Sequence, residues 1–187
     1  MPALVRSSQN AHYKGEAVSI IETERLLIRQ LSADDAAFML ELLNEPAFIK
    51  NIADRGVRTL DDARFYIEKG PVASYERYGF GLFAVVLKDS GIPIGMCGLL
   101  RRDYWEEVDI GYAILERYWL KGYAYEAASA MMDYGRNVLK LPRIVAITAP
   151  DNEGSARVLE KIGLRFEKLV TLGHNTEESK LFVPREA

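Results

Sequence analysis

One part of the sequence restricts the fold more than any other, because it alternates between strand-like and helix-like patterns. Residues 105–115 (WEEVDIGYAIL) and 143–150 (RIVAITAP) contain the branched apolar residues of strands, and the alanine-rich stretch 124–140 has the spacing of a helix. A strand, a helix and a second strand in this order form a βαβ unit, whose strands are parallel and whose crossover is right-handed. The chain is therefore predicted to have an α/β fold.

The remaining segments add strands and helices to this unit. Ser32 with Asp35 and Thr59 with Asp62 form capping boxes that begin two helices, and Gly70-Pro71 is expected to end the second of them. Strands are expected at 20–31, 79–89, 92–103, 105–115 and 143–150 and in a final hairpin over 164–183, and helices at 32–46, 59–70, 124–140 and 151–164. We predict one domain over residues 19–187, preceded by a flexible tail at 1–18.

Composition and charge disfavour several classes of function. The net charge of −3 provides no basic footprint for nucleic acid, and a mildly acidic protein weakly favours a cationic partner such as an amine. A single cysteine, Cys97, allows no intramolecular disulfide and no cysteine-based metal site. Residues 1–19 lack the apolar core of a signal peptide, and the apolar runs are too short to cross a bilayer. We expect a cytoplasmic protein with no membrane partner.

The loop 119–124 (WLKGYA) joins the first strand of the βαβ unit to its helix. Ligands of open α/β sheets bind at the carboxyl ends of strands, where the next helix begins. No Ser, Thr, Asp or Asn caps this helix, so its first N–H groups are free to bind an anion such as pyrophosphate, while Gly122 allows close approach and Lys121 adds positive charge. The simpler alternative is that Gly122 is only a turn residue. The common nucleotide loops G-K-[ST] and G-x-G-x-x-G are missing, which disfavours a nucleotide-binding regulator.

Several segments together carry a resemblance to a known family. They are TERLLIRQLSADDA (23–36), IPIGMCGL (92–99), DIGYAIL (109–115), WLKGYAYEA (119–127) and the pattern N-x-x-S-x-x-V-x-E-K-x-G at Asn152, Ser155, Val158, Glu160, Lys161 and Gly163. In this order they resemble the GNAT N-acetyltransferases, especially the branch of ribosomal-protein-alanine acetyltransferases (RimJ/RimL-like). The family loop reads Q/R-x-x-G-x-G/A. Trp119 holds its first position here, and Leu120 stands where a small residue is commoner.

The resemblance implies a fold and a cosubstrate. The fold would be a single GNAT-like α/β domain (α+β by some schemes), with a mixed, mostly antiparallel sheet, splayed parallel central strands and helices on both faces. Acetyl-CoA would lie between the strands that end at Ile114 and Ala149, without a metal, and a backbone N–H near Ala113 or Ile114 would polarise the thioester carbonyl. The implied cofactor-binding residues are Ala113, Ile114, Trp119, Leu120, Lys121, Gly122, Tyr123, Ala124, Asn152 and Ser155.

Proton transfer is assigned less directly. Many GNAT enzymes have a tyrosine on the second cofactor helix that acts as the general acid, but Leu159 holds that position here. The resemblance therefore points to Ser155 as the acid. The alternative is that the Ser155 hydroxyl only serves the start of its helix. Asp109 and Glu107 alternate onto one face of a strand and are candidate bases, as is His174; the alternative for both carboxylates is a solvated strand position. Asn152 is either a simple N-cap or also a ligand contact.

The leading hypothesis is an acetyl-CoA-dependent N-acetyltransferase that moves an acetyl group to a primary amine by direct attack on the thioester. The acceptor stays open between a protein N-terminus and a small-molecule amine, because acceptor pockets are not set by the fold. A non-catalytic acyl-CoA-binding module is the alternative. The sequence is compatible with a monomer or a homodimer.

Overall fold

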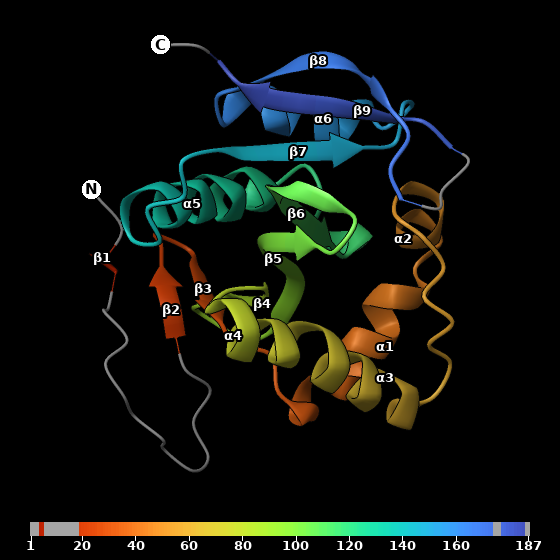
Figure 1. The fold of residues 1–187 in the computed structure, drawn as a ribbon. Helices are drawn as coiled ribbons and strands as arrows, with labels where there is room; N and C mark the ends of the chain where they lie inside the picture. The colour runs from red at the N-terminus through yellow and green to blue at the C-terminus, as the bar shows by residue number, and fades with distance from the viewer. Residues whose placement is uncertain (1–3, 6–18, 174–176, 186–187) are drawn as a thin grey trace.

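The computed structural model describes residues 4–5, 19–173 and 177–185, which form a layered α/β domain (Figure 1). The strands are β1 Leu4–Val5, β2 Ser19–Glu22, β3 Leu26–Arg29, β4 Leu82–Leu87, β5 Pro93–Arg102, β6 Trp105–Ile114, β7 Ile144–Thr148, β8 Leu164–Val170 and β9 Ser179–Pro184. The helices are α1 Ala36–Asn44, α2 Pro46–Asn51, α3 Leu60–Ile67, α4 Ala73–Tyr78, α5 Tyr123–Asn137 and α6 Glu153–Lys161, with short 3₁₀ turns at Ala33–Asp35 and Glu116–Tyr118.

The strands of the described part form one nine-stranded sheet in the order β1-β2-β3-β4-β5-β6-β7-β9-β8. Neighbouring strands are antiparallel except for β6 and β7, which are parallel and are joined through α5. The predicted α/β fold, with its mixed and mostly antiparallel sheet, is confirmed.

Helices cover both faces of the sheet because the strands alternate apolar side chains between the faces. On β4, Phe83 and Val85 belong to the core beneath α5 and α6, whereas Ala84 and Val86 pack with α1 and α3. Figure 1 shows α5 on one side of the central strands and α1 and α3 on the other.

Three expectations about local structure need correction. The single strand predicted at 20–31 is a hairpin of β2 and β3, because the Thr23 hydroxyl accepts the Leu26 N–H at 2.9 Å and forms a turn. Gly70-Pro71 does not end its helix: a π-helical turn at Glu68–Val72 accommodates Pro71, and the chain continues as α4 until Gly79. Leu4–Val5 pairs with β2, so part of the expected tail contributes a strand.

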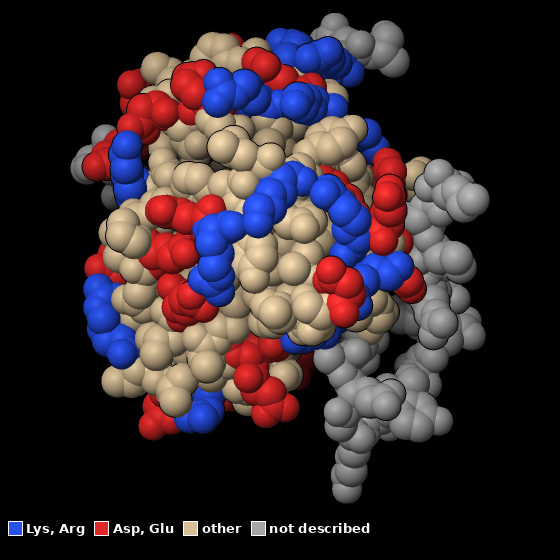
Figure 2. Space-filling model, turned by 180° about the vertical axis from the view of Figure 1, so that it is seen from behind, with Lys and Arg blue, Asp and Glu red and all other residues tan. Residues whose placement is uncertain are grey.

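Both capping boxes and the final β8–β9 hairpin are as predicted. On the face shown in Figure 2, Lys and Arg side chains are interspersed with Asp and Glu around uncharged areas. Among the described residues, no helix is both long enough and apolar enough to span a membrane.

Candidate functional site

The central parallel strands separate soon after they meet. Within the described residues, β6 pairs with β7 only at Val108 with Ile144 and at Asp109 with Val145. Beyond this point β7 continues to pair with β9, and β6 continues to pair with β5. The carboxyl-terminal part of β6 therefore turns an unpaired backbone edge toward β7, and the expected splay of these strands is confirmed.

The helix that follows β6 begins on a left-handed glycine. Gly122 has φ 83° and ψ 0° at the N-cap of α5, and no described side chain caps the helix. The first intrahelical bond runs from Glu126 N–H to the Gly122 carbonyl, so the N–H groups of the residues between them point out of the helix start. This arrangement at the end of a strand leaves an anion site made of main-chain donors and a helix dipole.

Leu120 makes the same loop unusual. It has φ 60°, a conformation that costs a residue with a Cβ roughly 1–2 kcal/mol, and its side chain is fully exposed. Glycine, which has no Cβ, would adopt this conformation without that strain. The neighbouring Lys121 extends its ammonium group over the Tyr118 ring, 5.3 Å from the centroid.

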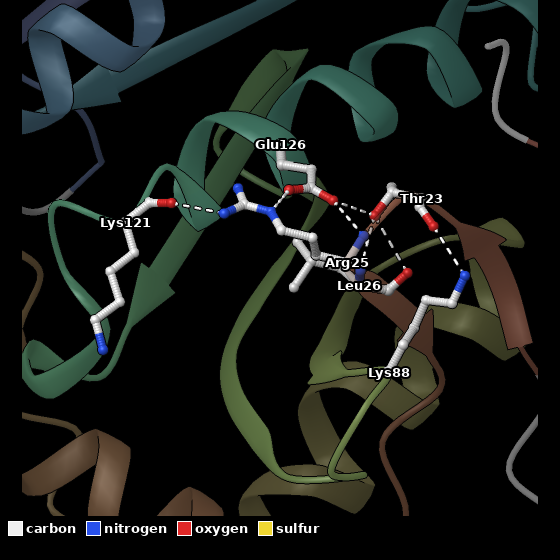
Figure 3. A network of polar contacts seen from close by, with 6 residues as sticks. All are labelled: Thr23, Arg25, Leu26, Lys88, Lys121 and Glu126. Atoms are coloured by element: carbon white, nitrogen blue, oxygen red, sulfur yellow. Dashed lines mark hydrogen bonds and ion pairs between the residues drawn. The ribbon is translucent and has the colours of Figure 1, made fainter.

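The β2–β3 turn contacts this loop and the start of α5 through a network of polar interactions (Figure 3). Arg25 donates from Nη1 to the Lys121 carbonyl at 3.0 Å and from Nε to Glu126 at 2.7 Å. The Glu126 carboxylate also accepts the Arg25 backbone N–H at 2.9 Å and the Thr23 hydroxyl at 2.6 Å. The Arg25 guanidinium lies 4.6 Å from the centroid of the Tyr123 ring. The conformation of the loop therefore depends on a distant segment of the chain.

The Trp119 side chain contacts the end of β6. Its indole Nε1–H donates to the Ile114 carbonyl at 2.6 Å, whereas the Leu115 N–H donates to Ile94 on the β5 side at 2.9 Å. Backbone groups alternate in direction along a strand, so the Ile114 N–H turns away from β5, toward the gap, and the Ala113 N–H turns toward β5. Of the two amides expected to polarise a thioester, the geometry favours that of Ile114.

The beginning of α6 lies on the other side of the gap. Asn152 caps the helix, and its Oδ1 accepts the Ser155 N–H at 3.0 Å. The Ser155 hydroxyl lies 2.9 Å from the Tyr112 hydroxyl, which comes from β6. Strand β6 and helix α6 thus contact each other through Tyr112 and Ser155. Leu159, at the position where the family resemblance leads one to expect a tyrosine, is buried in the core.

The two carboxylates expected as bases are held in ion pairs. Asp109 is 1% exposed, and Arg102 donates to both of its oxygens, at 2.8 and 2.9 Å. This bidentate pair occupies the carboxylate and argues against Asp109 as a base. Glu107 lies 3.0 Å from Arg143 and is partly exposed, so it stays accessible. His174 lies outside the described residues.

Sequence reasoning missed another carboxylate near the end of β6. Glu45, between α1 and α2, accepts the Glu116 N–H at 3.1 Å. Burial raises the pKa of Glu45, and the hydrogen bond from Glu116 offsets part of this effect. Lys50, at the far end of α2, pairs with Asp151 after β7 at 3.5 Å. The segment 45–50 therefore touches the ends of both splayed strands.

Comparison with known proteins identifies the family. Residues 25–165 match the acetyltransferase (GNAT) domain. The chain is 34% identical over 158 residues to an uncharacterised N-acetyltransferase, YnaD, of Bacillus subtilis, which covers 82% of this chain and 89% of that protein. A GNAT-family acetyltransferase from Bacillus anthracis has a TM-score of 0.71 and 31% identity, over 87% of this chain and 95% of that one. The chain therefore belongs to the GNAT family and is an N-acetyltransferase.

A more distant structure, which contains bound coenzyme A, shares the fold of this chain. RimL, described as a ribosomal L7/L12 α-N-protein acetyltransferase in complex with coenzyme A, has a TM-score of 0.74 at 14% identity, over 86% of this chain and 94% of that one. At this identity the likeness concerns the fold alone.

Proposed function

We propose that this protein transfers the acetyl group of acetyl-CoA to a primary amine, either a protein N-terminus or a small-molecule amine. The observation that carries the proposal is the gap between β6 and β7, which opens toward the uncapped amino end of α5. An extended ligand with amide groups and a pyrophosphate fits both features. The coenzyme A complex of RimL supports acetyl-CoA as the donor.

The cofactor contacts follow from the free backbone groups. The pyrophosphate would accept hydrogen bonds from the first N–H groups of α5, at Tyr123 and Ala124, beside the ammonium group of Lys121. The amides of the pantetheine arm would pair with the open edge of β6. The Ile114 N–H would then donate to the thioester carbonyl, where negative charge develops as the amine attacks. Trp119 contributes by fixing the strand end, and Asn152 by holding the start of α6.

The chemistry is a direct acyl transfer. The amine lone pair forms the C–N bond, the C–S bond breaks, and its electron pair leaves on sulfur. Ser155 would donate to this sulfur, which is a tolerable leaving group because a thiol has a pKa of about 8.5. The acceptor must also lose a proton. We propose Glu45 as the base, acting directly or through a water, with Glu107 as the alternative, since Arg102 occupies Asp109.

An acceptor screen tests the proposed function. Purified protein is incubated with acetyl-CoA and a panel of amines that includes peptides with free N-termini, polyamines, amino acids and aminoglycosides. We expect release of free CoA with at least one class, and mass analysis should find one added acetyl group on the amine. In a separate thermal-shift assay CoA should raise the Tm, and ATP and NAD should not. Binding of CoA without turnover of any amine would instead identify a non-catalytic acyl-CoA-binding module.

A further inference from the structure

Tyr112 contacts Ser155 at two atoms. Its hydroxyl donates to the Ser155 carbonyl at 3.1 Å and lies 2.9 Å from the Ser155 hydroxyl. A carbonyl only accepts hydrogen bonds, and a tyrosine hydroxyl has one proton. While Tyr112 donates to the carbonyl, the Ser155 proton therefore points to Tyr112. When Tyr112 donates to the Ser155 oxygen instead, the Ser155 proton is free for another acceptor.

The surroundings of Tyr112 keep it a neutral donor. Its ring packs on the core beneath α5 and α6, opposite Cys97 of β5. Burial raises the pKa of the Tyr112 hydroxyl, and the hydrogen bond with Ser155 offsets part of this effect. Burial likewise raises the pKa of Cys97 to about 12, so the adjacent thiol stays neutral as well. The Tyr112 hydroxyl is thus held in place and protonated through the neutral pH range.

We propose that Tyr112 is a positioning residue that orients and polarises the Ser155 hydroxyl toward the departing sulfur. The inference rests on the proposed function and adds to it a residue of β6, across from Ser155 of α6. As the C–S bond breaks, Tyr112 shifts its hydrogen bond from the Ser155 carbonyl to the Ser155 oxygen. Ser155 then donates its own proton in a hydrogen bond to the thiolate, and chained hydrogen bonds of this kind strengthen one another. The thiolate leaves as an anion and takes its proton from solvent.

A double-mutant cycle tests this role by steady-state kinetics with the acceptor found in the screen. We expect Tyr112→Phe, which keeps the ring, to lower kcat about tenfold with the acetyl-CoA KM within about twofold. Ser155→Ala should lower kcat about hundredfold, as expected for loss of a hydrogen-bond donor to the developing thiolate. The double variant should be no slower than Ser155→Ala, because Tyr112 acts only through that hydroxyl. The proposal would be overturned if the losses of kcat in the two single variants multiplied in the double variant, or if kcat were unchanged in Tyr112→Phe.

Tyr134→Phe is the matched control, since Tyr134 is a buried tyrosine of α5 in the same core and takes no part in the site. Its kcat should equal that of the wild type. The Tm of every variant shows whether a loss of activity reflects unfolding.

A second measurement needs no acceptor and so separates the two proposals. The ultraviolet absorbance of the CoA thiolate reports the pKa of the bound thiol, which is about 8.5 in free thiols. Wild-type protein should lower this pKa, and Tyr112→Phe should raise it again by at least about half a unit at similar CoA affinity. A pKa identical in both proteins would contradict the role of Tyr112. Failure of the wild type to bind CoA, or to acetylate any amine, would count against the proposed function itself.

Discussion

Glu126 binds Arg25 through two separate groups, the backbone N–H and the guanidinium, across 101 positions of the sequence. The contact joins the β2–β3 turn to the first turn of α5, and Arg25 extends it to the Lys121 carbonyl. It follows that the β2–β3 hairpin helps to shape the loop 119–124, although it contributes no backbone to the gap between β6 and β7.

Replacing Arg25 should weaken cofactor binding without changing the chemistry. Arg25→Met keeps a long stem over Tyr123 and removes the hydrogen bonds that the guanidinium donates to Glu126 and Lys121. We expect the acetyl-CoA KM to rise about tenfold, roughly 1.4 kcal/mol, with kcat within about twofold. Arg64→Met, which removes an exposed ion pair with Asp61 on α3, is the control. An unchanged KM in folded Arg25→Met would show that the loop keeps its shape unaided.

The same network should make stability depend on pH. Burial raises the pKa of Glu126, but the hydrogen bonds from Thr23 and Arg25 lower it by a larger amount. The pKa of Glu126 in the folded protein therefore lies below the ordinary 4.5. The ionised form is thus favoured by folding, and its stabilisation is present above the unfolded pKa and is lost as pH falls through the folded pKa. In urea unfolding, Glu126→Gln should be less stable than wild type at neutral pH, and the difference should shrink at pH values below about 4.5. A difference that is constant across this range would contradict the assignment.

Gly122 can be tested against a glycine with the same backbone conformation. Gly122→Val adds a branched side chain at φ 83°, and its Cβ would lie 3.3 Å from Arg25 Nη2. We expect acetyl-CoA affinity to fall at least about tenfold, or roughly 1.4 kcal/mol, in calorimetry. Gly79→Val imposes similar strain at φ 77°, where no described atom lies within 4 Å of the added Cβ. This control should lose comparable stability and keep its affinity. If both variants bound acetyl-CoA with the affinity of the wild type, Gly122 would be a turn residue only.

The pH profile of kcat/KM can identify the base. Glu45 acts as a base only when ionised, so the wild-type rate should rise as pH passes its pKa, which burial raises above the ordinary 4.5. Glu45→Gln should remove that rise and lower kcat/KM about hundredfold at neutral pH. Glu41→Gln, one turn earlier on α1 and paired with Arg117, should behave like wild type. If Glu107→Gln has the large effect and Glu45→Gln does not, the base is Glu107.

Features with a local signal were predictable from the sequence. The capping boxes at Ser32 and Thr59 and the uncapped start of α5 at Gly122 depend on neighbouring residues, so their spacing is enough to find them. The parallel pairing of β6 and β7 follows from the order strand, helix, strand, because a helical crossover returns the chain to the same end of the sheet.

The parts of the site that escaped prediction join distant residues. Arg25 and Glu126 lie in the segments TERLLIRQLSADDA and WLKGYAYEA, which carry the family resemblance, but neither segment indicates that the two residues contact each other. Glu45 reaches Glu116 across 71 positions, and Tyr112 reaches Ser155 across 43. For Asp109, alternation along the strand gave the correct face but could not show that Arg102 binds both oxygens. Such contacts depend on how elements pack, which periodicity does not describe.

The early separation of β6 and β7 also bears on the motions of the domain. Main-chain bonding across the centre of the sheet is confined to one short region, so β7, β9 and β8 with α6 form a unit that side-chain packing largely holds to the rest. Weakly bonded junctions of this kind open at lower free energy than a continuous ladder, and their amide protons exchange faster. A ligand that lies against both strands spans the junction. Its binding couples the two units, and protection from exchange then extends from one half of the sheet to the other.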